Sequence, residues 1–357
     1  MTSLFADHLS AVLWAGALLG LGYGMIAQWS RFCLLRGLVH RWQQNDGRRL
    51  RAFGLAMAVA VIASQGLAWV SGIDLQRTPY HPNGLPVVAL ILGGLLFGYG
   101  MTLANACGAR SLVLLGTGNL RSLLVLLVLG IAAYMTLSGV LAGLRLWLED
   151  LYRLSLPATD LTLLTTPLGL DSATGRLVIA GLLSLVLLVW TLSSRPFRAS
   201  PRDWLGGLLI GLMVAAGWWI TGVLGADDFD PVRLASLTFV APIGDGLQYL
   251  MLSTGTTLRF GVTVVAGVVV GSLMMALLTR EFRWQSFTGP GHTGRAISGG
   301  LMMGTGGILS IGCTLGQGLS GVSTLAISSL LALAGIVIGA RLAVRFSGPD
   351  RQQSPAS

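Results

Sequence analysis

The chain has 357 residues, of which 53% are apolar and only 10% are charged, and its mean hydropathy is +0.75. A soluble globular domain carries about 25% charged residues, so this composition excludes an ordinary cytosolic enzyme and a disordered protein. The net charge of +9 comes from arginines that lie between apolar runs and form no single patch, so it reflects membrane topology and not nucleic-acid binding. The composition therefore predicts an integral membrane protein.

Nine stretches of the chain are long and apolar enough to cross a bilayer as helices, which needs about 20 residues each. In chain order they are 9–27, 51–71, 85–104, 121–144, 174–193, 204–224, 259–279, 295–312 and 325–344. Helices satisfy their backbone polar groups internally, as the bilayer requires. We therefore expect an all-α polytopic membrane protein with a single transmembrane domain over 1–346, followed by a disordered tail at 347–357.

The arginines predict the orientation of these spans. Seventeen of the 23 fall on one side when the spans alternate, in the segments 31–51, 110–121, 195–202, 280–295 and 341–351. Arginine concentrates on the cytoplasmic side of membrane proteins. This predicts an N-terminus outside the cell and a C-terminus in the cytoplasm.

A glycine-rich segment precedes each of the three cysteines, which suggests an internal repeat. The pairs are 22–25 with Cys33, 98–101 with Cys107, and 304–307 with Cys313. A fourth copy without a cysteine runs from 207–222 to 242–246. We expect the helix to break at each glycine-rich segment. Non-helical backbone at membrane depth is tolerated only where protein or a cavity lines it, so the breaks indicate a pore or a binding site.

The repeats divide the chain into two halves, 9–145 and 204–345, joined by a single helix at 174–193. Because one helix is an odd number of crossings, the second half is expected to be inverted relative to the first, in a 4+1+4 arrangement. Inverted repeats with broken helices are a common transporter architecture.

The polar groups near the breaks suit an anion. They comprise thiols, amides, hydroxyls and the arginines Arg31 and Arg110, whereas no acidic residue falls in a span core. A lone membrane cysteine is usually a small apolar residue, but three cysteines in the same repeated context favour a function. Neutral thiols are weak donors that let a soft anion bind and leave, which favours a sulfur-containing oxyanion over chloride or phosphate. No catalytic set, metal site or cofactor is predicted, so we expect a transporter and not an enzyme.

Three blocks of the sequence carry a resemblance to a known family. They are Ser30–Leu34, Asn105–Gly108 with Gly116–Asn119, and Gly312–Gly321. In them the chain resembles the YeeE/YedE family of bacterial inner-membrane proteins, whose characterised members take up thiosulfate. The resemblance implies an inverted-repeat bundle of about nine spans in which short re-entrant helices form an hourglass.

The resemblance also implies the site and the partners. Cys33, Cys107 and Cys313 would line the constriction and pass thiosulfate between thiols through S–H···S contacts. The supporting residues in these blocks are Arg31, Asn105, Gly108, Arg110, Gly312, Thr314 and Gln317. Family members often work with a small cytoplasmic sulfurtransferase-like protein resembling TusA. Some relatives are linked to selenium or other sulfur species, and Arg110 departs from the pattern expected of thiosulfate members.

Two other hypotheses remain open. A membrane thiol enzyme, either a sulfurtransferase or a redox relay, would form a persulfide or a mixed disulfide, with Cys33 as the best candidate. A structural subunit or receptor would leave the chemistry to a partner, although a scaffold needs no interrupted helices. The sequence leaves open whether the path is a channel or a coupled carrier, and which oligomer forms.

Overall fold

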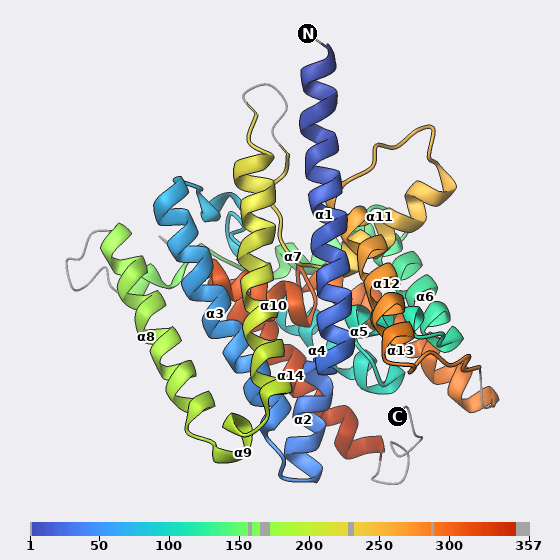
Figure 1. Ribbon diagram of the computed structural model, residues 1–357. Helices are drawn as coiled ribbons and strands as arrows, with labels where there is room; N and C mark the ends of the chain where they lie inside the picture. The colour runs from blue at the N-terminus through green and yellow to red at the C-terminus, as the bar shows by residue number, and fades with distance from the viewer. Residues whose placement is uncertain (1, 156–158, 165–171, 228–231, 287–288, 348–357) are drawn as a thin grey trace.

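The computed structural model describes residues 2–155, 159–164, 172–227, 232–286 and 289–347. Over these residues the fold is a bundle of helices (Figure 1), with one small antiparallel pair of strands, β1 (Leu85–Pro86) and β2 (Arg153–Leu154). The expected tail at 347–357 lies, apart from Ser347, outside the described residues.

The α-helices, in chain order, are α1 (Thr2–Ser30), α2 (Leu34–Gln43), α3 (Arg48–Ser71), α4 (Val87–Ala104), α5 (Gly108–Gly116), α6 (Leu120–Leu137), α7 (Ala142–Leu151), α8 (Ser172–Leu192), α9 (Arg195–Arg198), α10 (Pro201–Trp219), α11 (Val240–Met251), α12 (Phe260–Leu278), α13 (Pro290–Leu309) and α14 (Ile327–Ser347). Two 3₁₀ turns, η1 (Leu75–Arg77) and η2 (Leu161–Leu164), and two π-helical turns, η4 (Ile220–Leu224) and η5 (Gly316–Gly321), complete the described elements.

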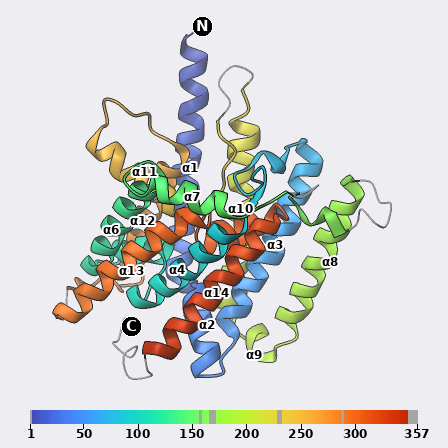
Figure 2. The same ribbon diagram turned by 180° about the vertical axis from the view of Figure 1, so that it is seen from behind.

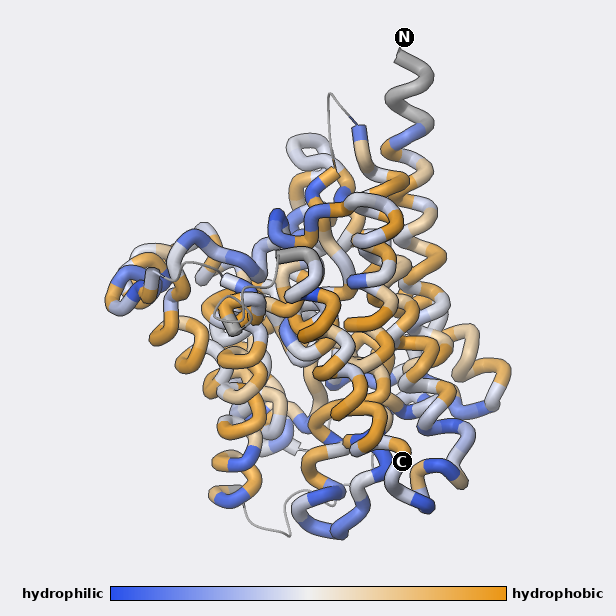
Figure 3. The backbone as a smooth tube through the Cα atoms, turned by 90° about the vertical axis from the view of Figure 1, so that its left-hand side faces the viewer, coloured by the Kyte–Doolittle hydropathy of each residue, from blue (hydrophilic) through white to orange (hydrophobic). Residues whose placement is uncertain are grey.

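Eight of the nine expected spans form helical segments long and apolar enough to cross a membrane. The ninth, 295–312, belongs to α13, whose first turns carry polar residues such as His292 and Arg295 and lower its hydropathy. The hydropathy colouring places apolar residues along the middle of the bundle and polar residues at its two ends (Figure 3). The chain is therefore a multi-pass membrane protein.

Helices from the two ends of the sequence pack against each other throughout the bundle. The helix α1 lies along α12, α4 lies against both α13 and α14, and α3 packs on α10. The view from behind shows α14 and α13 on the same side of the molecule as α4 (Figure 2). The first half of the chain is therefore folded against the second along most of its length.

The expectation that the helices break at the glycine-rich segments is wrong. The segments 22–25, 98–101 and 304–307 lie inside α1, α4 and α13, which continue past them. These glycines instead permit close helix crossings. A Cβ atom on Gly98 would lie 2.0 Å from the carbonyl oxygen of Ile336 in α14, and one on Gly24 would lie 2.3 Å from that of Val268 in α12. Small residues at such crossings let two backbones approach closely.

Candidate functional site

Three long helices end just before the three cysteines, and each ends through the same backbone feature. The residue two positions before each cysteine has a left-handed conformation, with φ of 52° at Arg31, 59° at Asn105 and 57° at Ile311. Each of these residues donates its backbone N–H to the carbonyl three positions earlier, over 3.1 to 3.4 Å. Asparagine tolerates this conformation, whereas arginine and β-branched isoleucine are strained in it.

Each cysteine then begins a short helix that turns away from the break. The carbonyl of Cys33 accepts the N–H of the residue four positions on, at 3.1 Å, and those of Cys107 and Cys313 do so at 2.8 Å. These helices are α2, α5 and the helical segment 314–323, whose middle is η5. The fourth expected copy follows the same rule, because the carbonyl of Phe239 accepts the N–H of Ile243 at 2.9 Å where α11 begins.

The structure brings the three cysteines into one buried cluster. Cys33 is 5% exposed, Cys107 4% and Cys313 1%. The side chain of Cys107 lies close to those of Cys33 and of Thr314, the residue after Cys313. The Sγ atom of Cys313 accepts the backbone N–H of Gly316 at 3.3 Å. The thiols and one hydroxyl therefore gather a set of soft, weakly polar groups in one buried region.

Tyr23 lies at the centre of this cluster. It is 2% exposed and lies near all three cysteines and Arg110. Its ring packs on Phe239, with 5.3 Å between the ring centroids. Phe239 thus fills the position that a cysteine occupies in the other three copies. Neither aromatic is predicted as a site residue from the sequence, although Tyr23 lies within the first glycine-rich segment.

Arg110 is a buried cation beside the thiols. It lies in the first turn of α5, is 7% exposed, and interacts electrostatically with Cys33 and Cys107. Its Nη1 atom makes only two long hydrogen bonds, 3.4 Å to the carbonyl of Ala27 and 3.5 Å to Oε1 of Gln28. Its Nε atom has no hydrogen-bond partner among the described residues. A buried guanidinium with unfilled donors suits a bound anion.

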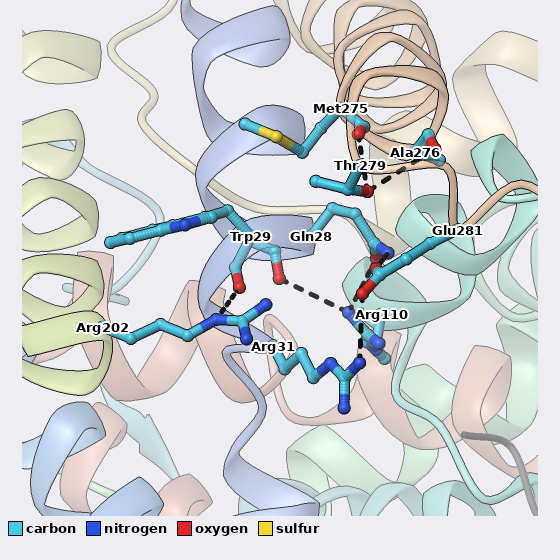
Figure 4. Close-up of polar contacts among 10 residues, drawn as sticks. Gln28, Trp29, Arg31, Arg110, Arg202, Met275, Ala276, Thr279 and Glu281 are labelled. Carbon is cyan, nitrogen blue, oxygen red and sulfur yellow. Dashed lines mark hydrogen bonds and ion pairs between the residues drawn. The ribbon is translucent and has the colours of Figure 1, made fainter. Parts of the chain in front are cut away.

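A polar network extends from Arg110 toward the arginine-rich end of the bundle (Figure 4). Gln28 donates from Nε2 to Oε2 of Glu281 at 3.0 Å, while its Oε1 accepts from Arg110. Arg31 pairs with the other carboxylate oxygen of Glu281 at 3.2 Å. The predicted site residue Arg31 therefore contacts a carboxylate and not a cysteine, and the sequence analysis did not anticipate Glu281.

The other predicted residues divide into two groups. Thr314 contacts the cysteine cluster, whereas Gln317 donates to the carbonyl of Ser310 and supports the backbone before Cys313. A Cβ atom on Gly108 would lie 3.3 Å from the side chain of Leu129, and one on Gly312 would lie 3.2 Å from that of Gln317, so both glycines lie tightly against a neighbouring side chain. No side-chain bond is described for Asn105, whose conformation shapes the break before Cys107.

The opposite end of the cluster is covered by aromatic and polar side chains of the segment before α4. Tyr80 packs edge-on against Trp218, with 6.5 Å between their centroids, and lies close to Thr238. His81 lies between the hydroxyls of Thr159 and Thr324, and its burial lowers its pKa. These side chains are therefore packed on the far side of the cysteines from Glu281.

A family model described as sulphur transport matches residues 29–342, which is most of the chain. The chain belongs to the sulphur transport family. It is 27% identical over 338 residues to the thiosulfate transporter TsuA of Escherichia coli, with 88% of each chain covered. It is 25% identical over 339 residues to the thiosulfate transporter TsuA of Spirochaeta thermophila, covering 92% of this chain and 97% of that one.

The matched range of the sulphur transport family includes all three cysteines and the short helices that they begin. The resemblance drawn from the three sequence blocks is therefore confirmed at the level of the family. Membership in a transport family also favours a transporter over an enzyme.

Proposed function

We propose that this protein takes up thiosulfate or a related sulfur-containing anion through the constriction formed by Cys33, Cys107 and Cys313. The observation that carries the proposal is the convergence of all three cysteines, each at the start of a short helix, around buried Tyr23. The names of the relatives and of the family support the substrate class.

The site attracts an anion without binding it tightly. Helix N-termini carry a partial positive charge, and those of α2, α5 and 314–323 begin at the three cysteines. Arg110 adds one full charge in a buried setting. Neutral thiols donate weakly, so an anion binds at each without being held, which conduction requires.

The contacts suggest the order of steps within the constriction. Cys33 lies close to Cys107, and Cys107 lies close to Thr314 beside Cys313. An anion handed from one thiol to the next through S–H···S contacts would follow this series, with Arg110 at the end nearer Gln28 and Glu281. No covalent change of a cysteine is needed for such a passage.

We further propose that the domain, 1–346, contains two inverted halves that form an hourglass with nine crossings. The helix pairings support related halves because they come in matched sets. The packing of α1 on α12 has its counterpart in α10 on α3, and the packing of α4 on α14 has its counterpart in α13 on α6. The helix α8, which packs mainly on α3, is the single joining element.

The proposed setting is the bacterial inner membrane, with the N-terminus outside and the C-terminus in the cytoplasm. The start of α1 and the end of α14 lie at opposite ends of the bundle, which supports an odd number of crossings (Figure 1). The arginine-rich end would then face the cytoplasm, where a small TusA-like sulfurtransferase is the proposed partner.

The test is uptake of labelled thiosulfate into proteoliposomes. We expect wild-type protein to take up thiosulfate, and Cys33→Ala, Cys107→Ala and Cys313→Ala to fall to the level of empty liposomes while remaining folded. Ser184→Ala is the matched control, because Ser184 is a buried polar residue of similar size at the contact of α8 with α3. This variant should transport normally.

The outcomes separate the competing functions. Wild-type uptake of a selenium anion or another sulfur anion, but not thiosulfate, would keep the path and change the substrate. No uptake of any such anion, together with a persulfide trapped on one cysteine, would overturn the transporter and favour the sulfurtransferase. Uptake that survives all three substitutions would remove the cysteines from the mechanism.

A further inference from the structure

A carboxylate lies where the proposed anion path leaves the cysteine cluster. Glu281 contacts both Gln28 and Arg31, and through Gln28 it is linked to Arg110, which faces Cys33 and Cys107. A fixed negative charge repels an anion that passes close to it. The position of Glu281 therefore needs an explanation beyond simple attraction of the substrate.

The backbone fixes Glu281 at this place. The helix α12 ends at Leu278, and Arg280 takes a left-handed conformation with φ of 55°. The N–H of Glu281 then donates to the carbonyl of Ala276 at 2.8 Å, as in the common left-handed ending of a helix. The hydroxyl of Thr279 bonds the carbonyl of Met275 at 2.9 Å (Figure 4). The carboxylate is thus presented by a capped helix end.

Gln28 couples this carboxylate to the buried arginine. Gln28 is 5% exposed, and the two ends of its amide meet opposite charges, with Oε1 toward Arg110 and Nε2 toward Glu281. The Oε1 atom can only accept, and it faces Arg110, so the amide must turn before it can donate to an anion bound there. That turn takes Nε2 away from Glu281. Binding of an anion at Arg110 and retention of Glu281 by Gln28 therefore compete.

The same contacts hold the break after α1 in place. Arg31 is the left-handed residue two positions before Cys33, and its guanidinium is tied to Glu281. Loss of the contacts from Gln28 and Arg31 would remove the side-chain links between the end of α1 and Glu281, while the carbonyl of Trp29 stays bonded to Arg202. The turn at Arg31 would then lose its side-chain anchor next to Cys33, which is 5% exposed in this structure.

We propose that Glu281, held by Gln28 and Arg31, is a gate that closes the arginine-rich end of the path until an anion at Arg110 takes over the Gln28 amide. This inference rests on the proposed function for the identity of the anion. The closing contacts themselves are properties of the fold that can be measured without transport.

The test measures how fast Cys33 reacts with an anionic methanethiosulfonate reagent applied from the arginine-rich side. The chain has three cysteines, so Cys33 is the sole thiol in a background of Cys107→Ser and Cys313→Ser. In that background Glu281→Gln removes the charge and keeps the shape. We expect the reaction to be faster by on the order of tenfold, because a hydrogen bond to a charged group and an ion pair are both weakened.

Two further variants sharpen the result. Arg31→Asn removes the ion pair from the other side while asparagine still favours the left-handed turn, so it should also speed the reaction. Asp46→Asn is the matched control, because Asp46 pairs with exposed Arg48 at 2.9 Å away from the gate. It should leave the rate unchanged.

The proposal fails if Glu281→Gln and Arg31→Asn, both folded by size-exclusion chromatography, react at the control rate. An equal acceleration by Asp46→Asn would also overturn it, since the effect would then be general surface charge. If these variants speed the reaction of Cys33 but the wild-type protein takes up no thiosulfate, the gate is supported and thiosulfate is not the substrate.

Discussion

At the scale of single residues, Asn105 has a conformational part in the site. It adopts φ of 59° two positions before Cys107, at the same place as Arg31 before Cys33 and Ile311 before Cys313. Left-handed backbone costs about 1–2 kcal/mol for an ordinary residue and less for asparagine or glycine. The break before Cys107 is therefore favoured by asparagine, which adopts the left-handed conformation at a lower cost than most residues.

Substitution of Asn105 separates this conformational part from direct contact with the anion. Asn105→Ala should lower the free energy of unfolding by about 1 kcal/mol and reduce thiosulfate uptake, because alanine disfavours the left-handed turn. Asn105→Gly should retain uptake close to that of the wild type. Thermal unfolding in detergent and proteoliposome uptake measure the two effects. Equal loss of uptake in both variants would instead show that the amide itself contacts the anion.

At the scale of elements, the helix crossings depend on glycines that leave no room for a side chain. Gly98 in α4 faces the backbone of α14, and Gly24 in α1 faces that of α12. Backbone cannot move aside as the end of a flexible side chain can. These crossings place α4 and α1 so that their ends meet beside Tyr23 and the cysteines.

Two alanine substitutions test this packing. Gly98→Ala should destabilise the protein by about 1–3 kcal/mol, because its Cβ would lie 2.0 Å from the carbonyl oxygen of Ile336. Gly181→Ala in α8 is the control, since nothing lies within 4 Å of its added Cβ, and it should be neutral or stabilising by about 0.5–1 kcal/mol. Unfolding midpoints in detergent compare the two. Similar midpoints for both variants would contradict a close α4–α14 crossing.

At the scale of the whole molecule, the charges at the two ends of the bundle indicate how the protein is oriented in the membrane. Seventeen of the 23 arginines belong to segments assigned to one side, and the matched helix pairings suggest two halves of opposite direction. Accessible loop positions at the two ends are available for a topological test. Gln44 follows α2, and Val140 lies between α6 and α7 and is 82% exposed.

Single introduced cysteines measure the orientation in cells. In a background without the three native cysteines, Val140→Cys should react with a membrane-impermeant thiol reagent added outside the inner membrane. Gln44→Cys should react only in inside-out vesicles, because the arginine-rich end is expected in the cytoplasm. The reverse pattern would invert the proposed orientation and place Glu281 at the outer mouth.

The sequence by itself determined the class of protein, the family, and the residues of the constriction that we propose. Long apolar stretches form membrane helices because only helices and closed barrels satisfy their backbone in lipid, so composition and length predict them directly. Three cysteines in a shared context pointed to one cluster, and the structure brings their side chains together. These features depend on local pattern, which a single sequence displays.

Only the tertiary structure decided where the helices break and what surrounds the cysteines. The breaks fall at Arg31 and Ile311, which carry no local signal for left-handed backbone, while the glycines that suggested them pack between helices. Phe239 completes the cluster without resembling a cysteine. Glu281 meets Gln28 across 253 positions of sequence. Such contacts arise because the two halves of the chain fold against each other. Residues that are brought together only by this packing, more than 200 positions apart, leave no periodicity or motif in the sequence.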